Sequence, residues 1–488
     1  MKKVVKNKVV TNYIYNSLYQ VLTIIIPIIT IPYVSRIFGA KGMGIYGYTF
    51  SVAQFFYIVG MFGISSYGIR EIAYVRNDRK KTTKKFWDIW SLQVITSLCG
   101  LAIYMVFIIY FDLLDYKIAF AFQIPFLLNA MFDISWFFIA MEDFKKTVTR
   151  NIIVKIVGLI LIFTFVKTSN DIYIYILINS SIVFIGSLTL WVFIKEYVGK
   201  LCIKNIKVKH HINGAALILI PQFSIQVYTS LDKILIGKLS TIEQVGFYDQ
   251  SQRIARIALE IVTSLSVVLM PRIASMYARN EVKKVEEYIV KSVNFTLASS
   301  IFIMSVIMGI SKNFVPWFFG SEFNVIVIYM MLTSLIILFI AVGGVFANQY
   351  TLPTNKNKEY IIPLLAASVI NISLNLILVP KFKALGGVIS IVITEFVVCL
   401  LRIILVKKYL DIKKIFKGTY GYCFAGTLSA ISVYISGDFI LGGFLGLVIQ
   451  GLVGLIVYTI ILYIINNPIK TEIVHRINER KLLKVNKK

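Results

Sequence analysis

The sequence predicts an all-α membrane protein that crosses the bilayer many times, and three observations lead to that class. Of the 488 residues, 58% are hydrophobic and only 15% are charged, and the mean hydropathy is +0.78. A soluble chain is roughly 45–50% apolar and about 25% charged. Apolar runs of about 20 residues, long enough to cross a bilayer as a helix, recur along the whole chain. Basic residues gather in the polar connectors between these runs.

About fourteen helices of this length can be placed along the chain. The first is expected to be a retained helix rather than a cleaved signal peptide, because its apolar stretch reaches past Ile37 and no small-residue cleavage site closes it. All connectors are short, so function is expected to reside in the membrane helices. The predicted spans are 10–38, 44–70, 86–111, 117–141, 151–167, 172–195, 213–238, 246–272, 288–311, 325–350, 359–380, 384–407, 417–437 and 440–466.

The formal net charge of +27 is distributed unevenly between the two sides of the membrane. When connectors are assigned alternately to the two sides, about 39 of the 51 Lys and Arg residues fall on the side of the N-terminus and about 8 on the other. The positive-inside rule then places both termini in the cytoplasm. The same distribution accounts for the charge without nucleic acid, for which no polar segment is long enough to form a binding domain.

Motifs for metals and nucleotides are missing from the sequence. The cysteines show no paired spacing, so neither a disulfide nor a metal site is expected. His210 and His211 lie next to Lys207 and Lys209 and are interpreted as part of a solvated basic loop. Because the chain has no Walker A sequence, no nucleotide or other cofactor is expected. The cysteines are Cys99, Cys202, Cys399 and Cys423.

The eighth predicted span carries four charged residues on one helical face. Asp249, Arg253, Arg256 and Glu260 are spaced i, i+4, i+7 and i+11. Lipid does not tolerate such a face, so it is expected to look into protein or a wet cavity. Arg256 and Glu260 lie near the middle of the bilayer, where an ion pair between them is the structural interpretation. For Arg253 and Arg256 we favour a cavity that receives an anionic cargo.

Polar side chains at helical spacing occur in other spans as well. The neutral ones are interpreted as contacts between helices, worth about 0.6 kcal/mol each on average. The polar residues of the fourth, seventh, eleventh and twelfth spans, neutral and charged together, are Asn129, Asp133, Gln222, Gln226, Thr229, Asp232, Lys233, Asn371, Asn375, Glu395 and Arg402.

The charged residues inside the predicted spans, including Arg36 and Glu260, have two interpretations each. Arg36, Lys233 and Arg402 lie close enough to the end of a span to extend to the interface. The carboxylates are candidate proton or Na⁺ sites, but each is favoured as the partner of a nearby Arg or Lys. The carboxylates in question are Asp133, Asp232, Glu260 and Glu395.

A faint internal repeat divides the chain. Arg36-Ile-Phe-Gly39, followed by Gly44-Ile-Tyr46, recurs as Lys233-Ile-Leu-Ile-Gly237, followed by Gly246-Phe-Tyr248. Parallel repeats are typical of transporters. We therefore predict a six-helix bundle at 1–210, a second at 211–408, two further helices at 409–466 and a basic cytoplasmic tail at 467–488.

Several motifs resemble a known family along essentially the whole chain. The first half resembles Wzx-type polysaccharide repeat-unit flippases in IPYVSRIFG at 31–39 and in DISWFF at 133–138 with Glu142. The second half resembles them in LDKILIG at 231–237, VGFY at 245–248 and MPRI at 270–273.

The resemblance implies the multidrug/oligosaccharidyl-lipid/polysaccharide exporter fold, in which two six-helix bundles surround a central cavity. It also implies a cargo of oligosaccharide linked by diphosphate to undecaprenol, moved to the outer leaflet of a bacterial cytoplasmic membrane for capsule or O-antigen-like polysaccharide. Arg36, Lys233, Arg253 and Arg256 match the cationic positions that hold the diphosphate. Membrane lipids, a coupling proton or Na⁺ and a polysaccharide polymerase are the further partners that it leaves open.

Elementary chemistry agrees with that cargo, although three alternatives remain. A charged, sugar-bearing head needs a wet cationic groove and alternating access to cross a bilayer, and Arg suits phosphate because it donates bidentate hydrogen bonds. A peptidoglycan-precursor flippase would share the diphosphate. A multidrug/cation antiporter favours an anionic pocket for its cationic drugs. A membrane polymerase needs catalytic carboxylates on an outer loop, whereas the outer loops here are short, so no enzyme activity is expected.

Overall fold

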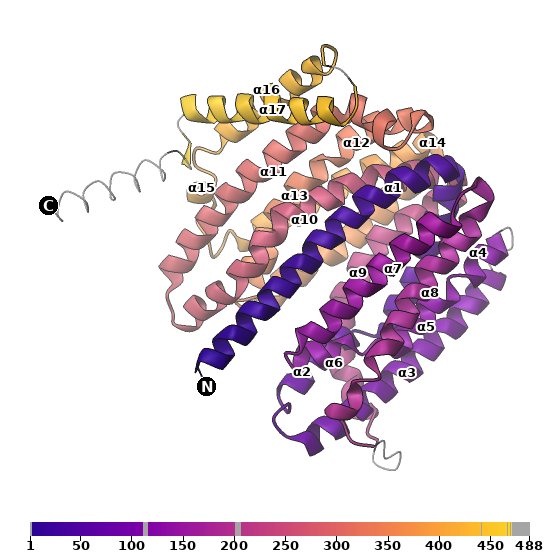
Figure 1. The fold of residues 1–488 in the computed structure, drawn as a ribbon. Coiled ribbons are helices and arrows are strands. Elements are labelled where there is room, and N and C mark those ends of the chain that lie inside the picture. The colour runs from indigo at the N-terminus through magenta and orange to yellow at the C-terminus, as the bar shows by residue number, and fades with distance from the viewer. Residues whose placement is uncertain are drawn as a thin grey trace. The chain divides into compact units, whose positions relative to one another are not determined.

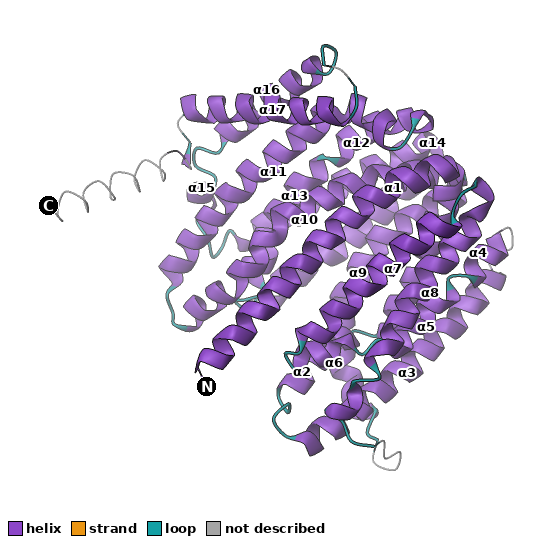
Figure 2. Ribbon diagram, in the orientation of Figure 1, coloured by secondary structure: helices purple, strands orange, loops and turns teal. Residues whose placement is uncertain are grey.

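The computed structural model contains only helices, turns and loops in the residues that it describes (Figure 2). Ten stretches of these residues are long and apolar enough to cross a membrane. The predicted all-α polytopic class is thus confirmed, while the predicted basic tail at 467–488 lies almost wholly outside the described residues. The structure describes residues 2–110, 116–200, 206–440, 442–465, 467–468 and 470, and side chains from residue 21 onward except 264–268.

The chain divides into two compact units, Met1–Gly246 and Phe247–Lys488. In Figure 1 the first unit runs from indigo to magenta and the second continues to yellow. The boundaries at 210, 408 and 466 that the sequence suggested stay predictions. Each unit is described below by itself.

Unit 1 covers the first seven predicted spans. A buried aromatic cluster that includes Phe86, Trp136 and Phe137 forms part of its core. Its elements are α1 (Lys2–Met61), α2 (Ile64–Ala73), α3 (Arg79–Tyr110), α4 (Lys117–Ala121), α5 (Ile124–Phe132), α6 (Ser135–Ala140), α7 (Phe144–Phe165), η2 (Ser169–Asp171), α8 (Ile172–Leu190), η3 (Ile194–Glu196), α9 (Lys209–Leu239) and the first turn of α10 (Ile242–Ala278).

Two of the spans in unit 1 differ from the simple helices that the sequence suggested. The first two spans form one element, α1, which bends at Gly39. Gly39 has φ 59° and ψ −170°, a conformation that glycine adopts without steric cost. The fourth span is broken into α4, α5 and α6, because Pro125 stands at the start of α5 and Asp133 is extended, with φ −74° and ψ 101°.

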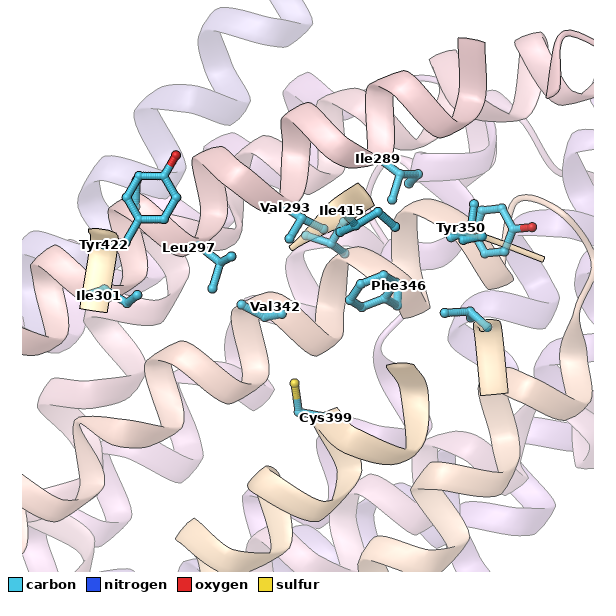
Figure 3. Close-up of a cluster of buried hydrophobic side chains, with 14 of the residues drawn as sticks. Ile289, Val293, Leu297, Ile301, Val342, Phe346, Tyr350, Cys399, Ile415 and Tyr422 are labelled. Carbon is cyan, nitrogen blue, oxygen red and sulfur yellow. The ribbon is translucent and has the colours of Figure 1, made fainter. Parts of the chain in front are cut away.

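Unit 2 covers the remaining spans. A buried apolar cluster along α11 (Val282–Phe318), α13 (Leu335–Gly344) and η6 (Val345–Thr351), which includes Ile289, Val293, Val342 and Phe346, forms its core (Figure 3). Besides α10, its elements are α11 (Val282–Phe318), η5 (Ser321–Val325), α12 (Ile326–Thr333), α13 (Leu335–Gly344), the π-helix η6 (Val345–Thr351), α14 (Asn357–Val406), α15 (Ile412–Ile415), α16 (Tyr420–Ser436) and α17 (Phe444–Ile464).

The element α14 contains two predicted spans, the eleventh and the twelfth. Lys383 interrupts it with φ 54° and ψ −131°, so α14 has two arms. The arms fold back on each other, because a Cβ on Gly386 would lie 2.4 Å from the carbonyl oxygen of Leu378. Both spans were therefore expected at the correct places, although one label covers them.

The last two helices, α16 and α17, pack on α11 through small residues and hydrogen bonds. The Tyr458 hydroxyl donates to the carbonyl of Ala298 at 2.8 Å, and the Ser429 hydroxyl donates to the carbonyl of Gly454 at 3.0 Å. In a bilayer, helices associate by close packing and interhelical hydrogen bonds rather than by hydrophobic burial. The trailing pair is thus an integral part of unit 2.

The repeated Gly-x-Tyr motif forms a close helix crossing inside unit 1. A Cβ on Gly44 would lie 1.8 Å from the carbonyl oxygen of Ile242, and a Cβ on Gly246 would lie 2.1 Å from that of Ala40. Ile242 stands four residues before Gly246, and Ala40 stands four residues before Gly44, so each helix places its glycine against a carbonyl of the other helix. A side chain at either glycine would force the two helices apart, which explains the glycine in both copies of the repeat.

We predict that Gly44→Ala lowers the thermal unfolding midpoint of the detergent-purified protein. The cost of forcing atoms into a packed contact is about 1–3 kcal/mol, and the clash at 1.8 Å is with backbone, which cannot rotate away. The matched control is Gly158→Ala in α7, where the nearest atoms, from Ile182, lie 3.8 Å and 4.0 Å from the added Cβ. Equal midpoints for the two variants would contradict the crossing.

Candidate functional site

The charged face of the eighth span lies on α10, in unit 2. Arg253 donates from Nε and Nη2 to the same carboxylate oxygen of Asp249, at 2.9 Å and 2.8 Å. The Asp249 side chain is 4% exposed and that of Arg253 is 28% exposed. One negative charge in the first part of the stripe is therefore matched by one positive charge.

The second half of the stripe lacks the corresponding pair. Arg256 is half-buried and Glu260 is exposed. Within the described residues neither side chain makes a hydrogen bond or an ion pair, so the Arg256–Glu260 pair that the spacing allows is not formed. The charge of Arg256 is thus not neutralised by its own helix, and a cation of this kind in a membrane span is a candidate site for an anion.

The other predicted cations, Arg36 and Lys233, lie in unit 1. Arg36 is exposed and stands three residues before the bend at Gly39, while Lys233 is half-buried on α9 and follows the fully buried Asp232. The helices α1 and α9 pack against each other. Arg36 and Lys233 therefore come from the two helices that carry the two copies of the repeat.

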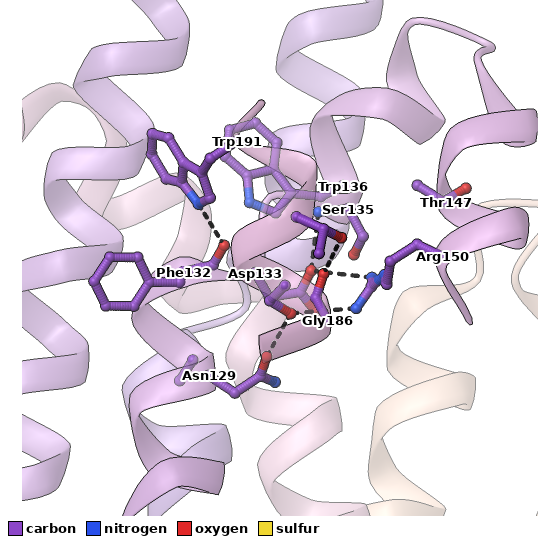
Figure 4. Close-up of polar contacts among 12 residues, drawn as sticks. Asn129, Phe132, Asp133, Ser135, Trp136, Thr147, Arg150, Gly186 and Trp191 are labelled. Carbon is purple, nitrogen blue, oxygen red and sulfur yellow. Dashed lines mark hydrogen bonds and ion pairs between the residues drawn. The ribbon is translucent and has the colours of Figure 1, made fainter. Parts of the chain in front are cut away.

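Asp133 occupies the break between α5 and α6 (Figure 4). One carboxylate oxygen, Oδ1, accepts the backbone N–H of Ser135 at 2.9 Å and lies 3.8 Å from Nη2 of Arg150. The side chains of Arg150 and Asp133 are 11% and 19% exposed. Asp133 thus accepts the first backbone N–H of α6 and forms an ion pair with Arg150, while its role as a charge partner or a coupling site stays a prediction.

Arg150 extends this pair into a polar network across four helices of unit 1. Its Nη1 donates to the hydroxyl of Ser187 at 3.2 Å, and Ser187 donates to Oδ1 of Asn129 at 2.5 Å. The amide of Asn129 donates to the hydroxyl of Tyr57 at 3.4 Å. Arg150 is therefore held by α5 and α8 within the helix bundle.

The backbone at this break is satisfied by Gln93 of α3. Its Nε2 donates to the carbonyls of Ala130 and Asp133, at 2.6 Å and 2.9 Å, and its Oε1 accepts from the indole of Trp136 at 2.9 Å. Broken helices persist at membrane depth only where such donors are available. In the motif DISWFF at 133–138, the carbonyl of Asp133 and the indole of Trp136 thus serve to hold the break in place through Gln93.

Arg150 was not among the residues that the sequence pattern indicated. The predicted fifth span began at residue 151, which assigned Arg150 to a connector, whereas α7 begins at Phe144. Val148 and Ile152 stand four residues apart, so helical spacing could have extended the span by a turn. The pairing with Asp133 is between different helices, and periodicity does not reveal such a contact.

The remaining carboxylate candidate, Glu395, is 4% exposed on the second arm of α14. On the first arm the fully buried Asn371 makes no side-chain hydrogen bond with the described residues, and Asn375 donates to the carbonyl of Asn371 at 2.9 Å. No group of three or more His, Cys, Asp or Glu side chains in the described part of the chain is arranged to hold a metal ion.

Comparisons with known proteins agree on one family. The model of the family described as "Polysaccharide biosynthesis protein" matches residues 9–277. The Escherichia coli K12 protein named "Putative O-antigen transporter" is 25% identical over 405 residues, 81% of this chain and 96% of that protein. The Haloferax volcanii protein named "Probable low-salt glycan biosynthesis flippase Agl15" is 22% identical over 246 residues, 48% of this chain and 50% of that protein.

A solved structure confirms the fold. The lipid II flippase MurJ, in an inward closed conformation, has a TM-score of 0.70 to this chain at 16% sequence identity. The likeness covers 93% of this chain and 98% of that one. The exporter fold that the sequence resemblance implied is therefore the fold of this protein.

We predict that Arg150→Met lowers the thermal unfolding midpoint, since it leaves the Asp133 carboxylate without its counter-charge and removes one of the two hydrogen bonds of the Ser187 hydroxyl. An unpaired buried polar group costs about 1–3 kcal/mol. The double variant Asp133→Asn with Arg150→Met should recover part of the loss. If Asp133→Asn instead left stability unchanged and abolished transport, Asp133 would be a coupling site rather than the partner of Arg150.

Proposed function

The chain belongs to the polysaccharide biosynthesis protein family, and we propose that it is a flippase for oligosaccharide linked by diphosphate to undecaprenol. The protein is a multi-pass membrane protein of a transporter family rather than an enzyme. Its proposed task is to move the lipid-linked repeat unit from the inner to the outer leaflet of a bacterial cytoplasmic membrane, for a capsule or O-antigen-like polysaccharide. The names of the two relatives, an O-antigen transporter and a glycan flippase, support this cargo.

One observation carries the proposal: on α10, which contains the eighth predicted span, Arg256 has no carboxylate partner among the described residues. A guanidinium stays charged at every physiological pH and matches phosphate oxygens bidentately. Arg253 lies on the same face one turn earlier and is held in place by Asp249. The α10 face therefore offers two guanidinium groups to an anion, and a diphosphate is the anion that a lipid-linked glycan presents.

The proposal also includes further cationic contacts, a coupled ion and an orientation in the membrane. Arg36 and Lys233 are the proposed diphosphate contacts in unit 1, and alternating access exposes the cationic residues to each leaflet in turn. Asp232, Glu260 and Glu395 are the proposed coupling sites or charge partners, with a proton or Na⁺ as the coupled ion. Both termini are placed in the cytoplasm by the basic connectors, and a polysaccharide polymerase is the proposed recipient of the cargo.

Two alternatives use the same fold with another cargo. A peptidoglycan-precursor flippase would present the same diphosphate to the same arginines, and its distinguishing mark would be rescue of a cell that lacks its own precursor flippase. A multidrug/cation antiporter would bring a cationic drug against Arg253 and Arg256, which repel it. Repulsion by the unpaired guanidinium of Arg256 thus disfavours a drug at this position, whereas the exposed Glu260 is the group of the stripe that a cationic drug would need to bind.

The proposal predicts that Arg256→Ala abolishes the appearance of surface polysaccharide on cells that depend on this protein. The loss should be at least about tenfold, since a charge-assisted contact to the moving diphosphate is removed. Arg256→Lys, which keeps the charge without the planar fork, should retain partial export. The readout is surface polysaccharide, with the amount of protein in the membrane measured in parallel.

The matched control is Arg279→Ala, which removes an exposed arginine in the connector that follows α10. Export by this variant should equal that of the unmodified protein. Normal export by Arg256→Ala at normal protein levels would overturn the proposed diphosphate contact.

A further inference from the structure

Arg402 does not extend toward the nearer membrane surface, as its position had suggested. It lies on the second arm of α14, four residues before the helix ends at Val406, so its Cα is about 6 Å from that end. Its Cδ and Nη1 lie 3.4 Å and 3.2 Å from the place that a Cβ on Gly343 would occupy, and the Cα of Cys399 lies 3.5 Å from the same point. Cys399 is about 4.5 Å deeper along α14. The side chain therefore runs back toward the middle of the membrane.

Among the described residues this guanidinium forms no ion pair, although the buried Glu395 lies seven residues earlier on the same arm, and both charges interact electrostatically with Cys399 between them. Arg402 makes no hydrogen bond or ion pair with any of the residues that the structure describes, and its Nε atom is buried without an acceptor. Arg253 and Arg150, by contrast, each lie beside a carboxylate. A charged group in a membrane span without such a partner is a candidate for ligand binding.

The surface beneath Arg402 is bare backbone. Gly343 and Gly344 end α13, and a side chain on Gly343 would occupy the space of the guanidinium. The π-helix η6 follows directly, and Asn348 is its exposed residue, with Nδ2 3.9 Å from the place of a Cβ on Gly344. π-Helical turns are frequent at functional sites. Arg402 thus lies against Gly343, and the amide of Asn348 lies beside Gly344, the next residue.

We propose that Arg402 and Asn348 form an anion site in unit 2 that takes a phosphate ester carried on a lipid. Donors that make no hydrogen bond or ion pair with the described residues can bind an acceptor-rich anion, and Arg favours the geometry of phosphate. Because the guanidinium lies in a candidate membrane span, the anion that we propose for it is the head group of a lipid. Two sources share this chemistry: the diphosphate of the cargo, for which the inference rests on the proposed function, and the head group of an anionic phospholipid.

Native mass spectrometry of the full-length protein in detergent tests the site and separates the sources. Undecaprenyl diphosphate and phosphatidylglycerol are titrated separately, with undecaprenol and phosphatidylcholine as uncharged and zwitterionic controls. Arg402→Gln removes the charge, and Gly343→Ala displaces the guanidinium while keeping it. Gly451→Ala in α17, where no atom lies within 4 Å of the added Cβ, and Lys407→Gln, which removes an exposed cation just beyond α14, are the matched controls.

The site predicts that Arg402→Gln and Gly343→Ala both weaken binding of one anionic lipid about tenfold or more, while the two controls do not. Loss confined to undecaprenyl diphosphate assigns the site to the cargo, and loss confined to phosphatidylglycerol assigns it to a phospholipid. Unchanged binding of both lipids by both variants overturns the inference, as does the lack of any binding by the unmodified protein. If Arg402→Gln does not fold, Gly343→Ala carries the test alone.

The proposed function stands or falls separately from this site. If Arg256→Ala abolishes export but Arg402→Gln binds both anionic lipids normally, the site at Arg402 fails and the flippase proposal survives. If Arg256→Ala exports normally while Arg402→Gln loses phosphatidylglycerol binding, the proposed diphosphate contact of Arg256 fails and the anion site at Arg402 survives.

Discussion

The cost of holding a charge in hydrocarbon is the constraint on which the rest of this structure depends. Insertion scales put it at about 2.5–3.5 kcal/mol for Arg or Asp at the centre of a membrane helix. In this protein two of the arginines inside predicted spans or at their ends form ion pairs with a carboxylate: Arg253 with Asp249, and Arg150 with Asp133. On the α10 stripe Arg256 and Glu260 have no such partner among the described residues, and Arg256 is the residue on which the proposed diphosphate contact depends.

The same constraint extends to the backbone. A helix that breaks inside a span exposes carbonyl groups, and each needs a donor because no water is available. Gln93 supplies that donor at the break beside Asp133, so the polar residues of the fourth span serve local structure. A polar motif in a membrane helix can therefore serve either the local backbone or a bound cargo. The hydrogen-bond partners of its side chains distinguish the two roles.

The sequence predicted the parts of the structure that depend on local pattern. Hydropathy placed the spans, and the repeat predicted glycines at equivalent positions, which the crossing of Gly44 and Gly246 explains. The spacing of Asp249 and Arg253 predicted that they share a face, and they form an ion pair. Contacts between helices could not be read in this way: the pairing of Arg150 with Asp133 and the inward course of Arg402 both depend on tertiary packing.

The central claim is that charge on the lipid-linked head group, rather than its sugar alone, is what the protein recognises. The most direct test uses the purified protein in liposomes and compares transbilayer movement of two lipids with the same oligosaccharide, one linked to undecaprenol by diphosphate and the other without phosphate. The account predicts protein-dependent movement of the diphosphate-linked lipid and little of the neutral one. Equal rates for both lipids, or no movement of the diphosphate-linked one, would contradict it.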